Sequence, residues 1–199
     1  MTDLNVLKIP LLLASASPRR KYLLEEAGFS LRIIPADIEE TYPEDLSPYE
    51  VPAYLSHKKG NTLLPFLETG EVILAADSVV ILEDRILGKP QDRSSAIEML
   101  QRLSNQKHEV VTGVTLMNAE KEMSFSNLSE VFFHPLNAEE IEYYVDHYHP
   151  FDKAGSYGIQ EWIGWCKIRK INGSYSNIMG LPVSLVYEKL QDFMPGDRH

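Results

Sequence analysis

The chain has 199 residues, of which 44% are hydrophobic and 24% are charged, a composition that excludes a disordered or fibrous protein. Its formal net charge of −10 opposes broad adhesion to nucleic acid, because nucleic-acid phosphates carry the same sign. The single cysteine, Cys166, excludes an internal disulfide and a thiolate-rich zinc site, and it is typical of a reducing compartment.

The length predicts one domain over residues 1–199. The longest apolar runs, such as residues 9–14 and 79–82, are far shorter than the roughly 20 residues that span a bilayer. Residues 1–5 carry an aspartate where a signal peptide would begin with positive charge. We therefore expect a cytoplasmic protein that partners neither membranes nor nucleic acid.

The first expected elements are a strand over Ile9–Ser15, a helix from Pro18, and a second strand over Phe29–Ala36. The strand joins the helix through the sequence Ser15-Ala16-Ser17-Pro18-Arg19-Arg20. Free N–H groups at a helix start favour a bound anion, which would also explain two arginines at the positive end of the helix dipole. The alternative is that Ser17 is an N-cap and both arginines are solvated, and the residues alone leave both readings open.

The charge along the chain supports an anion near this segment. Residues 1–36 hold five Lys and Arg against three acids, a net charge of +2, which leaves −12 for the remaining residues. A small anionic ligand near the N-terminal segment is therefore expected.

An acidic loop over Asp37–Ser47 and a helix to about Leu67 come next. The loop and the helix start hold six acids and no Lys or Arg: Asp37, Glu39, Glu40, Glu44, Asp45 and Glu50. Carboxylate oxygens are the ligands that Mg²⁺ or Mn²⁺ takes, although acidic stretches are usually solvated loops. Lys59 in the helix is either a phosphate contact or a solvated lysine.

Glu71–Leu82 is rich in Val, Ile and Leu, which predicts a strand buried on both faces. Asp77 lies inside this strand, where an ionised carboxylate loses hydration unless it is paired or bound to a metal. A functional acid and a solvated strand end both explain it. Lys89, in the loop that follows, is either a second phosphate contact or a solvated residue.

The rest of the chain predicts a mixed α/β protein. The expected elements are a helix over Asp92–Leu103, strands over His108–Met117 and Met123–Phe133, a helix from Asn137, a strand over Trp162–Ile171, and a helix from Leu181 through Leu190. The segment Asp152–Gln160 combines an acid, a base, two glycines and an amide, as in a loop that approaches a ligand. A tight loop with an exposed ion pair is the alternative, and Gln160 is a candidate reader of a base edge.

Separated segments, in one order along nearly the whole chain, resemble the Maf family. They are Leu13–Arg20, Ala75–Val80, Leu87–Pro90, Met99–Ser104 with Thr112–Val114, Asp152–Gln160, and Gly173–Tyr175 with Gly180–Pro182. The resemblance implies an elongated mixed β-sheet flanked by helices, with two lobes around a cleft as in ITPase-like folds, and often a homodimer.

The resemblance also implies hydrolysis of a nucleoside triphosphate to the monophosphate and pyrophosphate with a divalent metal, Mg²⁺ or Mn²⁺. The expected substrates are dTTP and UTP, with modified pyrimidine triphosphates as further candidates, in a role that cleans the nucleotide pool. The alternative is a nucleotide-binding regulator of septum formation that does not turn its ligand over.

Site residues are carried over by their positions in these segments. Asp77 is expected to be the catalytic base, and Glu40 and Asp77 to lie near the metal. Four residues are expected to hold the triphosphate: Ser15, Arg20, Lys59 and Lys89. Arg19, Ser78 and Gln160 fall where the branch that acts on dTTP and UTP carries its specificity residues. Ser78 departs from the more usual threonine and keeps the hydroxyl.

Overall fold

The computed structural model describes residues 4–193. The chain forms two compact units. The first comprises the chain up to Asp77, Thr112–Asn127 and the chain from Gly180; the second comprises Ser78–Val111 and Leu128–Met179. That the two units act as one domain stays a prediction.

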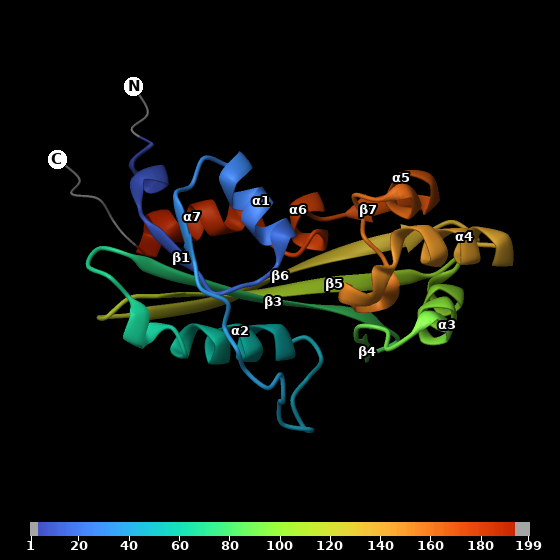
Figure 1. The fold of residues 1–199 in the computed structure, drawn as a ribbon, viewed down its shortest axis with the longest axis horizontal. Helices are drawn as coiled ribbons and strands as arrows, with labels where there is room; N and C mark the ends of the chain where they lie inside the picture. The colour runs from blue at the N-terminus through green and yellow to red at the C-terminus, as the bar shows by residue number, and fades with distance from the viewer. Residues whose placement is uncertain (1–3, 194–199) are drawn as a thin grey trace. The chain divides into compact units, whose positions relative to one another are not determined.

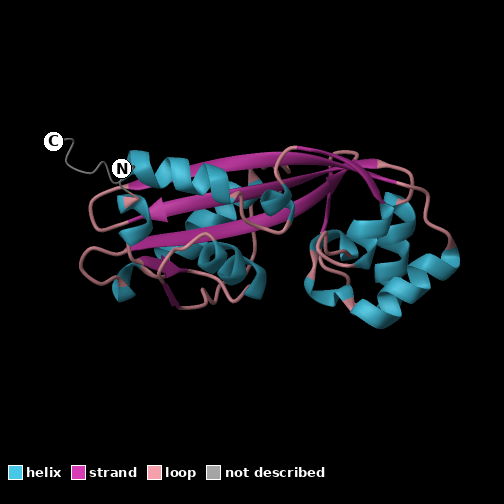
Figure 2. Cartoon of the chain, turned by 90° about the horizontal axis from the view of Figure 1, so that it is seen from above, coloured by secondary structure: helices cyan, strands magenta, loops and turns pink. Residues whose placement is uncertain are grey.

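The strands form one seven-stranded sheet in the order β2-β1-β3-β5-β6-β7, with β4 paired to β3. The strands β1 (Leu11–Leu13), β2 (Leu31–Ile33) and β3 (Val72–Leu82) are parallel to one another where they pair. The sheet is mixed, because β4 (Arg85–Leu87) pairs antiparallel with β3, and β7 (Ile168–Asn172) pairs antiparallel with β6. Strands and helices are distinguished by colour in Figure 2. The predicted mixed α/β fold is confirmed.

Three long strands carry residues of both units. They are β3, β5 (Lys107–Met117) and β6 (Glu122–Phe133), and β3 passes from the first unit to the second between Asp77 and Ser78. All three were predicted to within two residues at each end, because long runs rich in β-branched residues are a strong strand signal.

In the first unit, helices cover both faces of the strands. Figure 1 shows α1 (Pro18–Glu26) and α7 (Val183–Phe193) on one face and α2 (Val51–Asn61) on the other. Successive strand residues point to opposite faces, so Leu74 and Ala76 pack in the cluster with α1 and α7, whereas Ala75 packs in the opposite one. Asp77 continues this alternation, which turns its side chain toward α2.

The helix α2 lies unusually close to β5 within the first unit. A Cβ on Gly113 would lie 2.2 Å from the backbone nitrogen of Ala53, so no other residue fits there without a backbone shift. Beside this contact, the hydroxyl of Ser56 bonds that of Thr115 at 2.8 Å, and Thr115 bonds Ser124 at 2.9 Å. Backbone contact and buried hydroxyls together fix α2 against the sheet.

The expected helix to about Leu67 is wrong at its end. The helix α2 stops at Asn61, and a separate 3-10 turn, η2 (Leu64–Phe66), follows it. Pro65 explains the break, because proline donates no hydrogen bond to the preceding turn and disfavours helical backbone in the residue before it. Pro52 is tolerated because it lies in the first turn, where N–H groups have no partner within the helix.

In the second unit, α3 (Arg93–Leu103) and α4 (Ala138–Tyr148) confirm two predicted helices. Both begin with a capping box, in which Asp92 pairs with Ser95 and Asn137 pairs with Glu140. The last helix, α7, likewise confirms the expectation of a helix after Pro182. Among the residues that the structure describes, no helix is long and apolar enough to cross a membrane.

The expected strand over Trp162–Ile171 is wrong over its first six residues. These form α5 (Trp162–Lys167), and β7 begins only at Ile168; a short helix, α6 (Tyr175–Ile178), follows. The carbonyl of Glu161 accepts from the N–H groups of Gly164 and Trp165, which starts the helical turn. The aromatic and β-branched residues of this segment favour a strand locally, and the tertiary contacts override that preference.

Candidate active site

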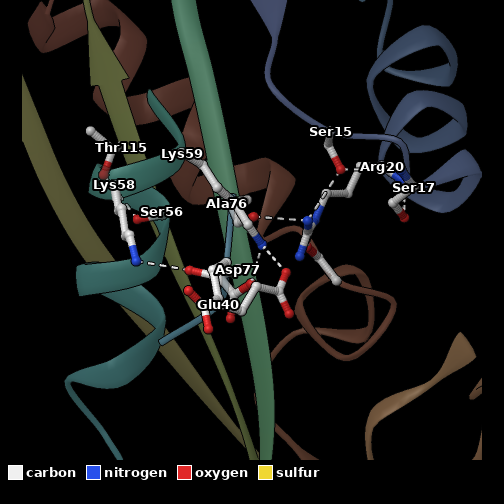
Figure 3. A network of polar contacts seen from close by, with 12 residues as sticks. Ser15, Ser17, Arg20, Glu40, Ser56, Lys58, Lys59, Ala76, Asp77 and Thr115 are labelled. Carbon is white, nitrogen blue, oxygen red and sulfur yellow. Dashed lines mark hydrogen bonds and ion pairs between the residues drawn. The ribbon is translucent and has the colours of Figure 1, made fainter. Parts of the chain in front are cut away.

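Asp77 is a buried carboxylate that is paired with a lysine. Its side chain lies on the α2 side of β3 and the residue is only 8% exposed. Nζ of Lys59, which is itself buried, lies 2.5 Å from Oδ1 of Asp77 and 2.6 Å from Oε1 of Glu40 (Figure 3). One ammonium therefore lies between two carboxylates, and the reading of Asp77 as a solvated strand end is wrong.

The surroundings of Asp77 shift its affinity for protons. Burial raises the pKa of the Asp77 carboxyl above its ordinary value, while the charges of Lys59 and Arg20 act in the opposite direction, and burial prevails. A carboxylate with a raised pKa is a better proton acceptor than an exposed aspartate. The site thus contains a group suited to general base catalysis.

The acidic loop is held in place by the lysine next to Lys59. Nζ of Lys58 donates to the carbonyl oxygens of Glu39 at 2.8 Å and Thr41 at 3.3 Å, and to the Thr41 hydroxyl at 3.2 Å. These residues flank Glu40, so Lys58 fixes the backbone on both sides of it while Lys59 pairs with its side chain. Sequence reasoning gave Lys58 no role, although two adjacent lysines opposite an acidic loop were a usable signal.

The segment after β1 is tied to the backbone beside Asp77. Ser17 caps α1, as one of the two readings predicted. Nε of Arg20 donates to the carbonyl of Gly180 at 2.8 Å, and Nη1 donates to the carbonyl of Ala76 at 2.8 Å and to Oγ of Ser15 at 3.2 Å. The reading of Arg20 as a solvated side chain is therefore wrong, since its guanidinium anchors the strand residue that precedes Asp77 (Figure 3).

Positive charge gathers at the start of α1. Burial lowers the pKa of Arg20, and the neighbouring charge of Arg19 adds to this effect, while Asp77 opposes it. Two adjacent guanidinium groups at a helix N-terminus make a favourable environment for an anion. Ser15, Arg19 and Arg20 thus fit the side of the site that a phosphate group would approach.

Glu40 and Asp77, the two residues expected to lie near a metal, both place a carboxylate oxygen against Nζ of Lys59. Among residues 4–193, no group of three or more His, Cys, Asp or Glu side chains could hold a metal ion. Mg²⁺ commonly binds proteins through only one or two carboxylates and takes its other ligands from water and substrate phosphates. Two converging carboxylates fit that mode of binding, with the phosphates as the remaining ligands.

The remaining predicted residues, Ser78, Lys89 and Gln160, lie in the second unit. There the N–H of Gly155 donates to the carbonyl of Gly88 at 3.1 Å, which brings the Lys89 loop and the Asp152–Gln160 segment together. Lys89 is exposed. The amide oxygen of Gln160 is buried and has no hydrogen-bond partner among the described residues.

The alternative interpretation of the same segment, a loop with an exposed ion pair, is wrong for Lys153. Lys153 is buried, and its Nζ lies 2.7 Å from Oδ1 of Asp152 and 3.1 Å from Oε1 of Glu161. Beside it, Trp165 is 72% exposed, and its indole N–H donates to the carbonyl of Gln160 at 2.9 Å. The loop is thus tied both to a buried ion pair and to α5.

Comparison with known proteins decides the family. Residues 10–193 match the family model described as Maf-like protein. The chain belongs to the Maf family. The match begins just before β1 and ends at the last residue of α7, so it includes all the residues discussed above.

Curated Maf relatives are similar over nearly their full length. A protein of Bacteroides thetaiotaomicron is 46% identical over 189 residues, which is 94% of this chain and 97% of that protein. One from Cytophaga hutchinsonii is 47% identical over 181 residues, or 91% of this chain and 83% of that protein. Both are named dTTP/UTP pyrophosphatase.

The fold of this Maf protein also resembles that of a distant solved structure. The Ham1 protein of Staphylococcus aureus matches with a TM-score of 0.50 at 15% sequence identity, covering 93% of this chain and 100% of that one. At this identity the likeness concerns the fold alone, and it agrees with the expected Maf and ITPase-like architecture.

Proposed function

We propose that the chain hydrolyses dTTP and UTP to the corresponding monophosphate and pyrophosphate. Relatives with 42–47% identity over most of the chain, all named dTTP/UTP pyrophosphatase, support this substrate class. The observation that carries the proposed chemistry is the buried Asp77 carboxylate paired with Lys59 beside Glu40. A base, a cation and a second carboxylate are the groups that hydrolysis of a polyphosphate needs.

In the proposed reaction a water molecule attacks the α-phosphorus. The new P–O bond forms as the bond to the β-phosphate oxygen breaks, pyrophosphate leaves with the bonding electrons, and the Asp77 carboxylate takes the proton of the water. Ser15, Arg20, Lys59 and Lys89 are proposed to supply donors and positive charge to the phosphate oxygens. Fixed donors of this kind stabilise the charge that grows on the leaving group.

We propose that Glu40 and Asp77 hold Mg²⁺ or Mn²⁺ together with the substrate phosphates. When bound, the cation supplies charge neutralisation at the phosphates. Lys58 keeps Glu40 at this position by holding the loop backbone on both sides of it. Without Lys58, Glu40 would keep its charge and its ion pair with Lys59, but the loop backbone on both sides of it would lose an anchor.

Base selection is proposed to rest on Arg19, Ser78 and Gln160. A side-chain amide offers one acceptor and two donors, which can pair with the edge of uracil or thymine. The buried amide oxygen of Gln160, which has no partner among the described residues, supports this role. We further propose that the protein acts in the cytoplasm and removes unwanted pyrimidine triphosphates from the nucleotide pool.

A product-resolved assay tests the proposal. Purified protein is incubated with dTTP, UTP, CTP, ATP and GTP and Mg²⁺, and the monophosphate, diphosphate, pyrophosphate and orthophosphate are separated. We expect monophosphate and pyrophosphate from dTTP and UTP, and a fall of at least about 10²-fold in Asp77→Asn. Asp45→Asn, which changes an exposed acid, is the matched control. Binding without turnover would favour a regulator, and orthophosphate with diphosphate would contradict cleavage at the α-phosphate.

A further inference from the structure

Gln160 lies in a tight turn within the second unit. The N–H of Glu161 donates to the carbonyl of Gly158 at 3.0 Å, which closes a four-residue β-turn with Gln160 at its third position. The turn is pressed against α5, because a Cβ on Gly164 would lie only 1.8 Å from the carbonyl oxygen of Ile159. The backbone of Gln160 is therefore fixed from the α5 side.

A second set of contacts holds the turn from α4. The hydroxyl of Tyr144 donates to the carboxylate of Glu161 and accepts from the N–H of Gly158 at 2.9 Å. Tyr144 is fully buried, and burial together with Glu161 raises the pKa of its hydroxyl, so that it remains a donor. Lys153 adds an ion pair to the other oxygen of Glu161 at 3.1 Å. One hydroxyl thus joins the first and last residues of the turn.

The Gln160 amide and the Glu161 carboxylate lie on the same side of the turn. A Cβ placed on Gly158 would meet Nε2 of Gln160 at 2.9 Å and Cδ of Glu161 at 2.8 Å, so both groups converge on this glycine. The negative charge of Glu161 favours the orientation in which the NH₂ group of the Gln160 amide faces the carboxylate. Oε1 is buried and has no donor among residues 4–193, so it is an unsatisfied acceptor that an N–H group of a base would satisfy.

The orientation of the amide matters for base selection because a 180° rotation of the amide exchanges the positions of its donor and its acceptor. Uracil and thymine present a donor at N3 and an acceptor at O4, whereas cytosine presents an acceptor at N3 and a donor at the amino group. A freely rotating glutamine could pair with either base. When the base is held in one position, a glutamine oxygen fixed opposite N3 accepts from the N3–H of uracil or thymine but meets the N3 lone pair of cytosine, which repels it.

We propose that Tyr144 and Glu161 are positioning residues that fix the Gln160 amide and thereby set the preference for uracil and thymine over cytosine. The inference rests on the proposed function, since it concerns the base that the same enzyme accepts. Neither residue was assigned a role from the sequence, and Lys153 contributes by holding Glu161 in place.

The test is the ratio of kcat/KM for UTP to that for CTP. Tyr144→Phe removes the hydroxyl that joins the turn, and Glu161→Gln keeps an acceptor for Tyr144 while removing the charge. Because an oriented pair of hydrogen bonds contributes most of such discrimination, we expect each change to lower the ratio by about tenfold. Tyr148→Phe, which changes the ring stacked on Tyr144, is the matched control and keeps the wild-type ratio.

The outcomes separate this inference from the proposed function. A merely structural role would lower both kcat/KM values by the same factor and leave the ratio unchanged. A wild-type enzyme that prefers UTP, with variants that keep the ratio within twofold, would overturn the inference alone. If Tyr144→Phe does not fold, Glu161→Gln decides the question. A wild-type chain that releases no pyrophosphate from UTP or dTTP would overturn the proposed function itself.

Discussion

Nζ of Lys59 lies 2.5 Å from Oδ1 of Asp77, which is the one acidic residue of β3. The charge of Lys59 lowers the pKa of Asp77, while burial raises it and prevails. The carboxylate must be ionised to accept a proton, so activity falls as the pH drops through its pKa. Under the proposed role of Asp77, we expect the opposing effects of Lys59 and burial on this pKa to set the acid limit of activity.

Changing Lys59 to Gln should move the acid limb of the profile of kcat/KM against pH to higher pH, because the group that lowers the pKa of Asp77 is lost. The kcat/KM at the optimum should also fall by about 10²-fold, since a cation is removed from the site. Pyrophosphate release from UTP between pH 5 and 9 measures both effects. An acid limb that stays in place would show that another group controls it.

The neighbouring Lys58→Gln should behave differently. Lys58 donates to the loop backbone and to the Thr41 hydroxyl, whereas Lys59 pairs with Asp77, so the acid limb should remain at its wild-type pH. Looser placement of Glu40 should raise the Mg²⁺ concentration needed for half-maximal activity by roughly three- to tenfold. A metal titration at fixed UTP measures this change, and an unchanged requirement would contradict the role given to the loop.

Gly113→Ala should destabilise the fold, because the added methyl group would lie 2.2 Å from the backbone nitrogen of Ala53. Forcing α2 away from β5 should lower the free energy of unfolding by at least about 2 kcal/mol. Urea unfolding measures the loss. Gly88→Ala is the control, because a Cβ there meets nothing within 4 Å, and a loss of equal size in both variants would contradict the packing argument.

His108 makes the fold sensitive to acid. It is buried in β5 with Nε2 2.8 Å from the Tyr157 hydroxyl, and burial lowers its pKa from 6.5 to about 3. Between these values the unfolded chain binds a proton that the folded chain does not. Stability should therefore fall as the pH drops from 6.5 toward 3, by up to about 1.4 kcal/mol per pH unit from this residue.

The contribution of His108 can be isolated by substitution. His108→Gln should lower stability at pH 7 by about 1–3 kcal/mol through lost packing, and it should also flatten the dependence of stability on pH below 6.5. Urea unfolding at several pH values measures both. The exposed His134→Gln should keep the wild-type slope, and a His108 variant with that same slope would contradict the assignment.

The sequence alone could predict the residues whose signal is local. Asp77 stood out because a charged residue interrupts a long apolar strand, and Ser17 because a serine before proline is a common N-cap. The partners of Arg20 could not be predicted, since the carbonyls of Ala76 and Gly180 lie 56 and 160 residues away along the chain. Backbone acceptors carry no side-chain signature, so only the fold reveals such contacts.

The Gln160 turn shows that a binding residue can be predicted while its surroundings cannot. The family segment pointed to Gln160 itself, but the residues proposed to position it are Tyr144 on α4 and Glu161 just before α5, and the sequence pattern of α5 favoured a strand. Within that helix Gly164 lies close to the carbonyl of Ile159, a backbone contact that the strand-like residue pattern did not indicate. Residues that bind are thus easier to predict than residues that position them.

Trp165 combines an exposed indole with a hydrogen bond to the backbone of Gln160. The chain has only two tryptophans, so Trp162→Phe would leave this single fluorophore, one hydrogen bond away from the residue proposed to read the base. The emission of an indole responds to water, to hydrogen bonding and to stacked rings. The Trp162→Phe variant would thereby carry a built-in optical probe, through which nucleotide affinity and the speed of binding could be followed without a label.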